Sequence, residues 1–96
     1  MRKEREVAIG DKRGLHLRVI RAFAEKAQGY SSSIHVQSST AAADGKSPLE
    51  MMLLEGGPGS KLKIVAEGED AGEALAALAE FIENPDLAPA PGEENT

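Results

Sequence analysis

The spacing of the apolar residues changes between two periods along this chain, and that change restricts the fold more than any other feature. Val7 and Ile9 alternate with other residues, which predicts a strand over residues 6–9. From residue 19 to residue 27 the apolar positions recur every three or four residues, which predicts an amphipathic helix. Gly29 follows, and a glycine at this place is typical of the C-terminal end of a helix.

The same two periods continue through the rest of the chain. Two further alternating segments, 31–37 and 62–66, are predicted to be strands, and residues 41–44 are expected to form a short strand although their three alanines carry little pattern. Ser47 and Pro48 predict the start of a short helix, because serine is a favoured N-cap and proline suits the first helical position. A last helix is expected after Asp70, where Asp70 and Glu73 resemble a capping box. The order strand, helix, strand, strand, helix, strand, helix predicts a two-layer α+β sandwich with helices on one face of the sheet.

Length and composition set the class of protein. A chain of 96 residues suits one domain, which we place at residues 1–84. Residues 85–96 are rich in proline, alanine and acids, and predict a disordered tail. There is no cysteine, the first six residues are too charged for a signal peptide, and no apolar run is long enough for membrane insertion. We therefore expect a cytoplasmic protein.

The charge is distributed unevenly. Residues 1–28 carry a net charge of +4, and residues 29–96 carry −9, within a total of −5. So acidic a chain with so few aromatic residues is a poor candidate for binding nucleic acid. The basic residues surround His16, so an acidic protein partner or a phosphate is expected on that side.

The segment Gly14-Leu15-His16-Leu17-Arg18 is the candidate chemical site. It places His16 at the N-terminus of the first predicted helix, where free backbone N–H groups and the helix dipole stabilise an anion. A neutral imidazole is a competent nucleophile, and Arg18 suits phosphate oxygens through paired hydrogen bonds. From the residues alone, the alternative is a histidine that only caps a helix.

Three landmarks in the right order resemble the HPr family, the histidine-containing phosphocarriers of the bacterial phosphoenolpyruvate-dependent phosphotransferase system. The first is the segment 14–18, the second is Lys46-Ser47 before a short helix, and the third is the segment 66–70 before the last helix. The resemblance runs from about Glu6 to Glu83. It implies an open-faced β-sandwich with the order βαββαβα, in which a four-stranded antiparallel sheet carries three helices on one face.

The resemblance also implies a function and its site. His16 would take a phosphoryl group on Nδ1 from enzyme I and pass it to an enzyme IIA-type acceptor, in sugar uptake or in a regulatory, nitrogen-type branch. The backbone N–H groups of Leu17 and Arg18 would bind the phosphate, and the Arg18 side chain would assist electrostatically. Such a protein is a carrier and not a turnover enzyme, and needs no cofactor or metal.

Other positions match the family less directly. Ser47 matches the serine that a regulatory kinase phosphorylates in some members, although it also fits a plain N-cap. Leu49 and Met52 match apolar positions that meet partner proteins. Val19 stands where the family usually has proline, and Glu55 where it commonly has glycine. We expect a monomer, and the alternative function is a regulatory binding module that transfers no phosphate.

Overall fold

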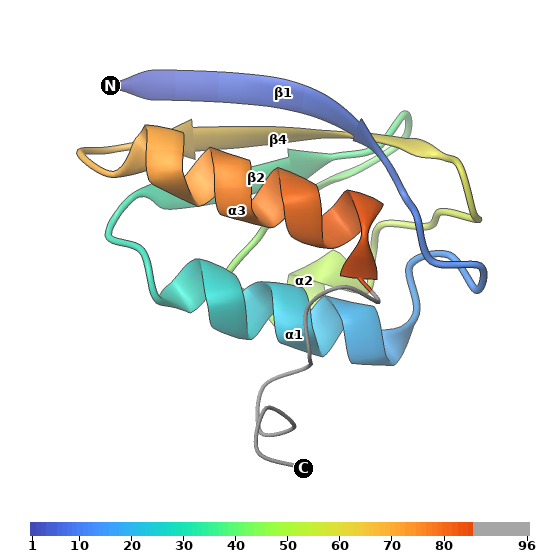
Figure 1. Cartoon of the computed structure of the whole chain (residues 1–96). Helices are drawn as coiled ribbons and strands as arrows, with labels where there is room; N and C mark the ends of the chain where they lie inside the picture. The colour runs from blue at the N-terminus through green and yellow to red at the C-terminus, as the bar shows by residue number, and fades with distance from the viewer. Residues whose placement is uncertain (86–96) are drawn as a thin grey trace, which may run out of the picture.

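The computed structural model describes residues 1–85, and these form the predicted order of four strands and three helices (Figure 1). The elements are β1 (Arg2–Ala8), α1 (Leu17–Gln28), β2 (Ser33–Gln37), β3 (Ala42–Asp44), α2 (Pro48–Met51), β4 (Lys61–Glu67) and α3 (Ala71–Glu83). Residues 86–96 of the expected tail lie outside the described part of the chain. The prediction of an α+β fold with this element order is confirmed.

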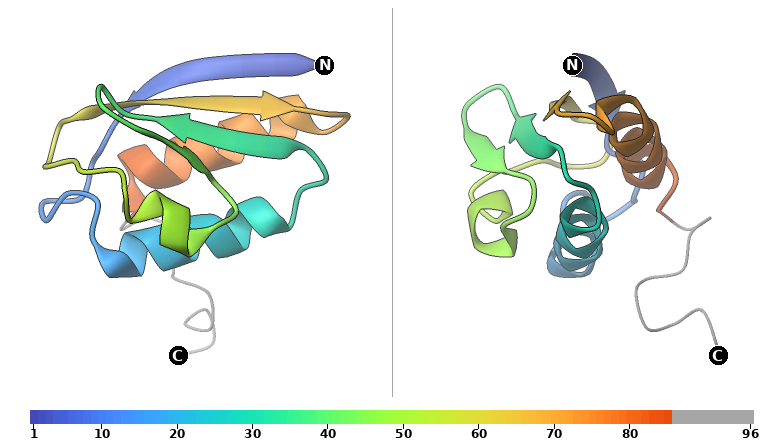
Figure 2. Two further views of the ribbon diagram at one scale, coloured as in Figure 1. Left: turned by 180° about the vertical axis from the view of Figure 1, so that it is seen from behind. Right: turned by 90° about the vertical axis from the view of Figure 1, so that its left-hand side faces the viewer.

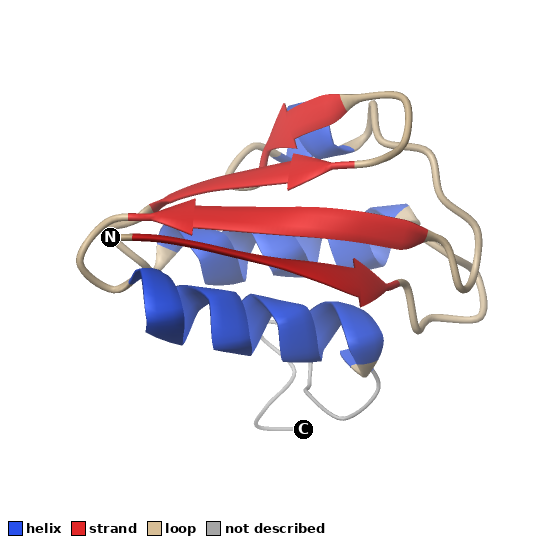
Figure 3. Cartoon of the chain, turned by 90° about the horizontal axis from the view of Figure 1, so that it is seen from above, coloured by secondary structure: helices blue, strands red, loops and turns tan. Residues whose placement is uncertain are grey.

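The four strands form one antiparallel sheet in the order β1-β4-β2-β3. All three helices lie on one face of this sheet, and seen from above the opposite face is uncovered (Figure 3). His35 is exposed on β2 between the buried Ile34 and Val36, as the alternation predicts. The open-faced architecture is therefore confirmed.

The core lies between the sheet and the two long helices. Side chains from both layers are almost completely buried there: Val7, Phe23, Ile34, Val36, Leu62, Ile64, Leu78 and Ile82. α1 and α3 run in opposite directions beneath the sheet, so the end of α3 lies near the start of α1 (Figures 1 and 2). None of the helices in residues 1–85 is long and apolar enough to cross a membrane.

β1 begins at Arg2 and not at residue 6, where the sequence pattern places its start. Its first residues lack an apolar alternation, so the sequence does not reveal them as a strand. They are held in the sheet by backbone pairing with β4, from Arg2 opposite Glu67 onward. On the uncovered side, Glu4 forms an ion pair with Lys63 of β4 at 3.1 Å. Strand pairing can therefore extend beyond the residues that bury apolar side chains.

The predicted capping box at the start of α3 is wrong. Asp70 is the N-cap residue, but its side chain makes no capping hydrogen bond. Its carboxylate instead accepts hydrogen bonds from the backbone N–H groups of Ser31 and Ser32 and from the Ser32 hydroxyl. The same contacts occupy the segment before β2, which explains why that strand begins at Ser33 and not at residue 31.

Candidate functional site

His16 is the N-cap residue of α1, as the sequence predicts. Its backbone is extended, with φ −99° and ψ 171°, and its carbonyl accepts the first helical hydrogen bond from the N–H of Ile20 at 3.0 Å. The His16 side chain makes no capping hydrogen bond. His16 therefore caps the helix through its backbone only, and its imidazole takes no part in the cap.

The loop that carries His16 is held against two other segments. The Leu15 N–H donates to the Gly56 carbonyl at 2.9 Å, and the Gly10 N–H donates to the Ile82 carbonyl at the end of α3 at 3.0 Å. Gly14 has a φ of +74°, and a Cβ at this position would lie 2.4 Å from the Gly56 oxygen. Gly14 thus lets this loop approach the backbone after α2 closely, and the approach fixes the position of the site.

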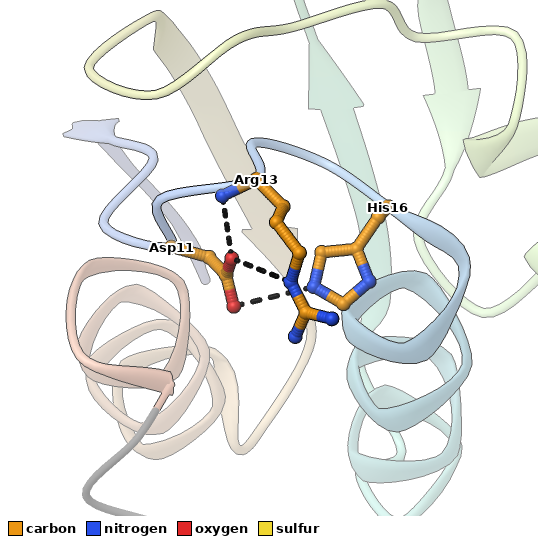
Figure 4. A network of polar contacts seen from close by, with 3 residues as sticks. All are labelled: Asp11, Arg13 and His16. Carbon is orange, nitrogen blue, oxygen red and sulfur yellow. Dashed lines mark hydrogen bonds and ion pairs between the residues drawn. The ribbon is translucent and has the colours of Figure 1, made fainter.

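Asp11 contacts His16 from inside this loop (Figure 4). Its side chain is only 8% exposed, and Oδ2 lies 3.2 Å from Nε2 of His16. The other oxygen, Oδ1, accepts a hydrogen bond from the Arg13 backbone N–H at 2.8 Å and lies 3.6 Å from the Arg13 Nε. The backbone hydrogen bond from Arg13, followed by the contact with His16, lowers the pKa of the Asp11 carboxyl.

The two nitrogens of the His16 ring lie in different surroundings. The side chain is 22% exposed, and Nε2 is buried. Nε2 is at ion-pair distance from Asp11, but the pair does not have the geometry of a good hydrogen bond. The other nitrogen, Nδ1, points away from Asp11, on the side of the first turn of α1 (Figure 4). The ring therefore presents Nδ1 toward the helix N-terminus.

The first turn of α1 supplies donors for an anion. The N–H groups of Leu17 and Val19, in this first turn, have no acceptor within the helix, because the first N–H groups of any α-helix lack one. Val19 contributes such an N–H, which a proline at this position would not. The helix dipole adds a partial positive charge at the same place.

The surface around this site combines positive charge with apolar side chains. Lys12, Arg13, Arg18 and Arg21 are exposed. Leu17 at the start of α1 and Leu49, Met52 and Leu53 at α2 are the large apolar side chains exposed here. Because α1 and α2 lie side by side (Figure 2), these apolar side chains come from neighbouring elements. Met51, by contrast, is fully buried and anchors α2 to the core.

Ser47 is placed as its N-cap prediction requires. Its hydroxyl accepts a hydrogen bond from the Glu50 backbone N–H at 3.2 Å, and Pro48 follows at the first helical position. α2 has only four residues, so Met52 and Leu53 lie just beyond its end. The described residues contain no group of three or more side chains able to hold a metal ion.

Asp11 and Gly56 are not among the predicted site residues. Asp11 is the one acid in the segment 10–18, which is otherwise basic, and this position is a signal that could have identified it. Gly56 carries no signal of its own, because its importance depends on the close approach of Gly14 from a distant part of the chain.

The chain is similar to known proteins over most of its length. The family model described as "PTS HPr component phosphorylation site" matches residues 3–84. The phosphocarrier protein HPr of Borreliella burgdorferi is 42% identical over 81 residues, which cover 84% of this chain and 94% of that protein. The HPr of Pseudomonas aeruginosa is 39% identical over 80 residues, covering 82% of this chain and 89% of that protein.

Solved structures lead to the same family. A crystal structure of HPr from Thermoanaerobacter tengcongensis matches with a TM-score of 0.82 and 34% identity, covering 91% of this chain and 98% of that one. The match thus includes sequence, fold and nearly the whole length of the relatives. The chain belongs to the HPr family of phosphocarrier proteins of the phosphotransferase system.

Proposed function

We propose that His16 is the residue of this phosphocarrier that accepts the phosphoryl group, and that it does so on Nδ1. The observation that carries this proposal is the orientation of the ring. Nε2 is buried against Asp11, whereas Nδ1 lies on the side of the first turn of α1. A phosphoryl group on Nδ1 would lie near donors that have no helical partner.

Each neighbour of His16 has a proposed role. The backbone N–H groups of Leu17 and Arg18 bind the phosphoryl oxygens, and the exposed Arg18 guanidinium contributes positive charge. The transferred group carries negative charge, so fixed donors at the helix N-terminus stabilise it without rearrangement. His16 becomes a covalent intermediate, and a second protein removes the phosphoryl group.

Membership of the family defines the partners at the level of class. The chain is a cytoplasmic component of the phosphotransferase system and works between enzyme I and enzyme IIA proteins. We propose that both partners contact the exposed Leu49 and Met52 beside the site. An exposed apolar group surrounded by polar residues is typical of a protein-docking surface.

Two further predictions have simple tests. Phosphorylation of Ser47 by a regulatory kinase is tested with an HPr kinase and the Ser47→Ala variant. Because the Ser47 hydroxyl caps α2 beside the acidic Glu50, we favour a capping role for it.

The expected monomer is tested by light scattering of the purified chain.

The central experiment measures intact mass after incubation with enzyme I, magnesium and phosphoenolpyruvate. We expect one added phosphate that is lost in acid and is absent from the His16→Ala variant. The histidine makes no hydrogen bond that caps the helix, so this variant should remain folded by circular dichroism.

Two results would contradict the proposal. If His16→Ala still accepted an acid-labile phosphate, the site would lie on another residue, with His35 the remaining histidine. If the folded wild-type chain accepted no phosphate from several enzyme I proteins, His16 would not be an acceptor.

A further inference from the structure

We propose that Asp11 is a positioning residue for phosphoryl transfer, which holds the ring proton of His16 on Nε2 and so leaves the Nδ1 lone pair free to attack phosphorus. This inference rests on the proposed function of His16 as the acceptor. It adds a second residue to the site, one that touches neither the phosphoryl group nor a partner protein.

The surroundings of Nε2 determine which ring nitrogen carries the proton. Nε2 is buried and faces Asp11 Oδ2 at 3.2 Å. A neutral imidazole carries one N–H and one lone pair. If Nε2 held the lone pair, it would face the lone pairs of a carboxylate oxygen 3.2 Å away, which is a repulsive contact. A proton on Nε2 instead gives an attractive contact, and a buried polar atom needs one.

Asp11 is itself held in place. Its side chain is almost fully buried, and Oδ1 accepts the Arg13 backbone N–H at 2.8 Å. The preceding residue, Gly10, is tied to the end of α3 by a hydrogen bond to the Ile82 carbonyl. The carboxylate therefore cannot turn away from His16 without losing its hydrogen bond from the Arg13 backbone N–H. The hydrogen bond from the Arg13 N–H also lowers the pKa of Asp11, which favours its charged form further.

The transfer step has a simple balance in this arrangement. The Nδ1 lone pair of His16 forms the new bond to phosphorus. The bond from phosphorus to the donor atom of phosphorylated enzyme I breaks, and its electron pair leaves with that atom. The Nε2 proton stays on His16, so the ring becomes positively charged as the bond forms. The Asp11 carboxylate lies next to that developing charge and stabilises it.

The variant Asp11→Asn tests this arrangement with little change in shape. Its amide oxygen can still accept the Arg13 N–H, and its NH2 group then faces Nε2. That group donates, so it favours the lone pair on Nε2 and moves the ring proton to Nδ1. In serine proteases, the same aspartate-to-asparagine change beside the catalytic histidine keeps the geometry but lowers the rate, because the histidine takes the wrong tautomer.

Two measurements are made on the full chain. The 15N chemical shifts of the His16 ring, recorded near pH 9 where an ordinary imidazole is neutral, report the tautomer. We expect Nε2–H in the wild type and a shift toward Nδ1–H in Asp11→Asn. The rate of phosphorylation by enzyme I should fall about tenfold, which corresponds to the loss of about 1.4 kcal/mol of stabilisation of the developing positive charge.

Asp70→Asn is the matched control. It makes the same substitution at a carboxylate that also accepts backbone N–H groups, but at the start of α3. We expect the wild-type tautomer and rate in this variant. An unchanged tautomer in Asp11→Asn, or an altered tautomer with an unchanged rate, would overturn the proposal. The tautomer is measured without phosphate, so these results are distinct from a failure of His16→Ala to abolish acceptance.

Discussion

Two aspartates at different places in the fold show how the same side chain serves different purposes. Asp11 lies in the loop before α1, and Asp70 lies at the start of α3. Each accepts backbone N–H groups from a nearby segment, and each has a lowered pKa. They differ in what each carboxylate contacts besides these backbone N–H groups.

At Asp70, both oxygens bind donors of the segment before β2, and these donors are two backbone N–H groups and the Ser32 hydroxyl. Every contact there joins one structural element to another. At Asp11, one oxygen holds its own loop, and the second faces the ring of His16. From this difference we infer that a carboxylate can influence the reactivity of a neighbouring group when one of its oxygens faces that group.

A glycine accompanies each aspartate, and replacing it should have the largest effect on stability. Gly14→Ala places a Cβ 2.4 Å from the Gly56 oxygen, and Gly68→Ala places one 2.5 Å from the Ser32 hydroxyl. Both glycines have positive φ, so each variant should lose about 2–4 kcal/mol in the free energy of unfolding. Urea denaturation measures this loss.

Activity separates the two glycine variants. In the folded fraction, Gly14→Ala should slow phosphorylation by about a hundredfold, because a shift of the loop displaces His16. Gly68→Ala should leave the rate per folded molecule unchanged. Equal losses of rate in the two variants would show that the loop before α1 does not position the site independently of the rest of the fold.

The Asp70 contacts predict a dependence of stability on pH. Hydrogen bonds from the Ser32 hydroxyl and the Ser31 N–H lower the pKa of Asp70 to about 2, from an ordinary value of 3.8. A carboxyl whose folded pKa is lowered adds stability above its ordinary pKa, and that contribution is lost as the pH falls toward the folded value. Asp70→Asn should therefore lower the melting temperature at pH 7.

The difference between Asp70→Asn and the wild type should then narrow between pH 4 and pH 2, as the wild-type carboxyl is protonated. Thermal unfolding at each pH, followed by circular dichroism, measures it. A constant difference across this range would mean that the charge of Asp70 does not contribute to stability.

Much of this fold could be predicted from the sequence because burial imposes a period on the apolar residues. The alternation at Leu62 and Ile64 predicts β4, and the spacing of Ile20 and Phe23 predicts α1. The position of His16 follows, since it directly precedes that helical spacing. The features that could be predicted are those recorded in the residue pattern of a single segment.

The contacts of the two aspartates could not be predicted in this way. Asp70 binds Ser31, which lies 39 residues away, so no local pattern records the pair. The capping box at Asp70 and Glu73 is a reasonable local prediction, but tertiary contacts occupy the carboxylate. Asp11 and His16 are close in sequence, yet their approach depends on a loop shape held from outside.

The apolar surface near His16 offers a test with no expected effect on stability. Leu49 is 77% exposed, so Leu49→Ser should leave the unfolding free energy within about 0.5 kcal/mol of the wild type. It should raise the KM for enzyme I about tenfold if Leu49 is a central contact. Ala76→Ser, at an exposed position on α3, is the control. An unchanged KM would remove Leu49 from the docking surface.

The smallest effect is expected at Arg13, and it sharpens the interpretation of Asp11. The exposed Arg13 guanidinium lies 3.6 Å from Asp11 Oδ1, and such a pair contributes about 0–1 kcal/mol to stability. Arg13→Ala removes this ion pair but keeps the backbone N–H that holds the carboxylate. We therefore expect the Nε2–H tautomer of His16 and nearly the wild-type phosphorylation rate. If the 15N shifts instead moved toward Nδ1–H, the guanidinium and not the buried backbone contact would be what holds Asp11 against the ring.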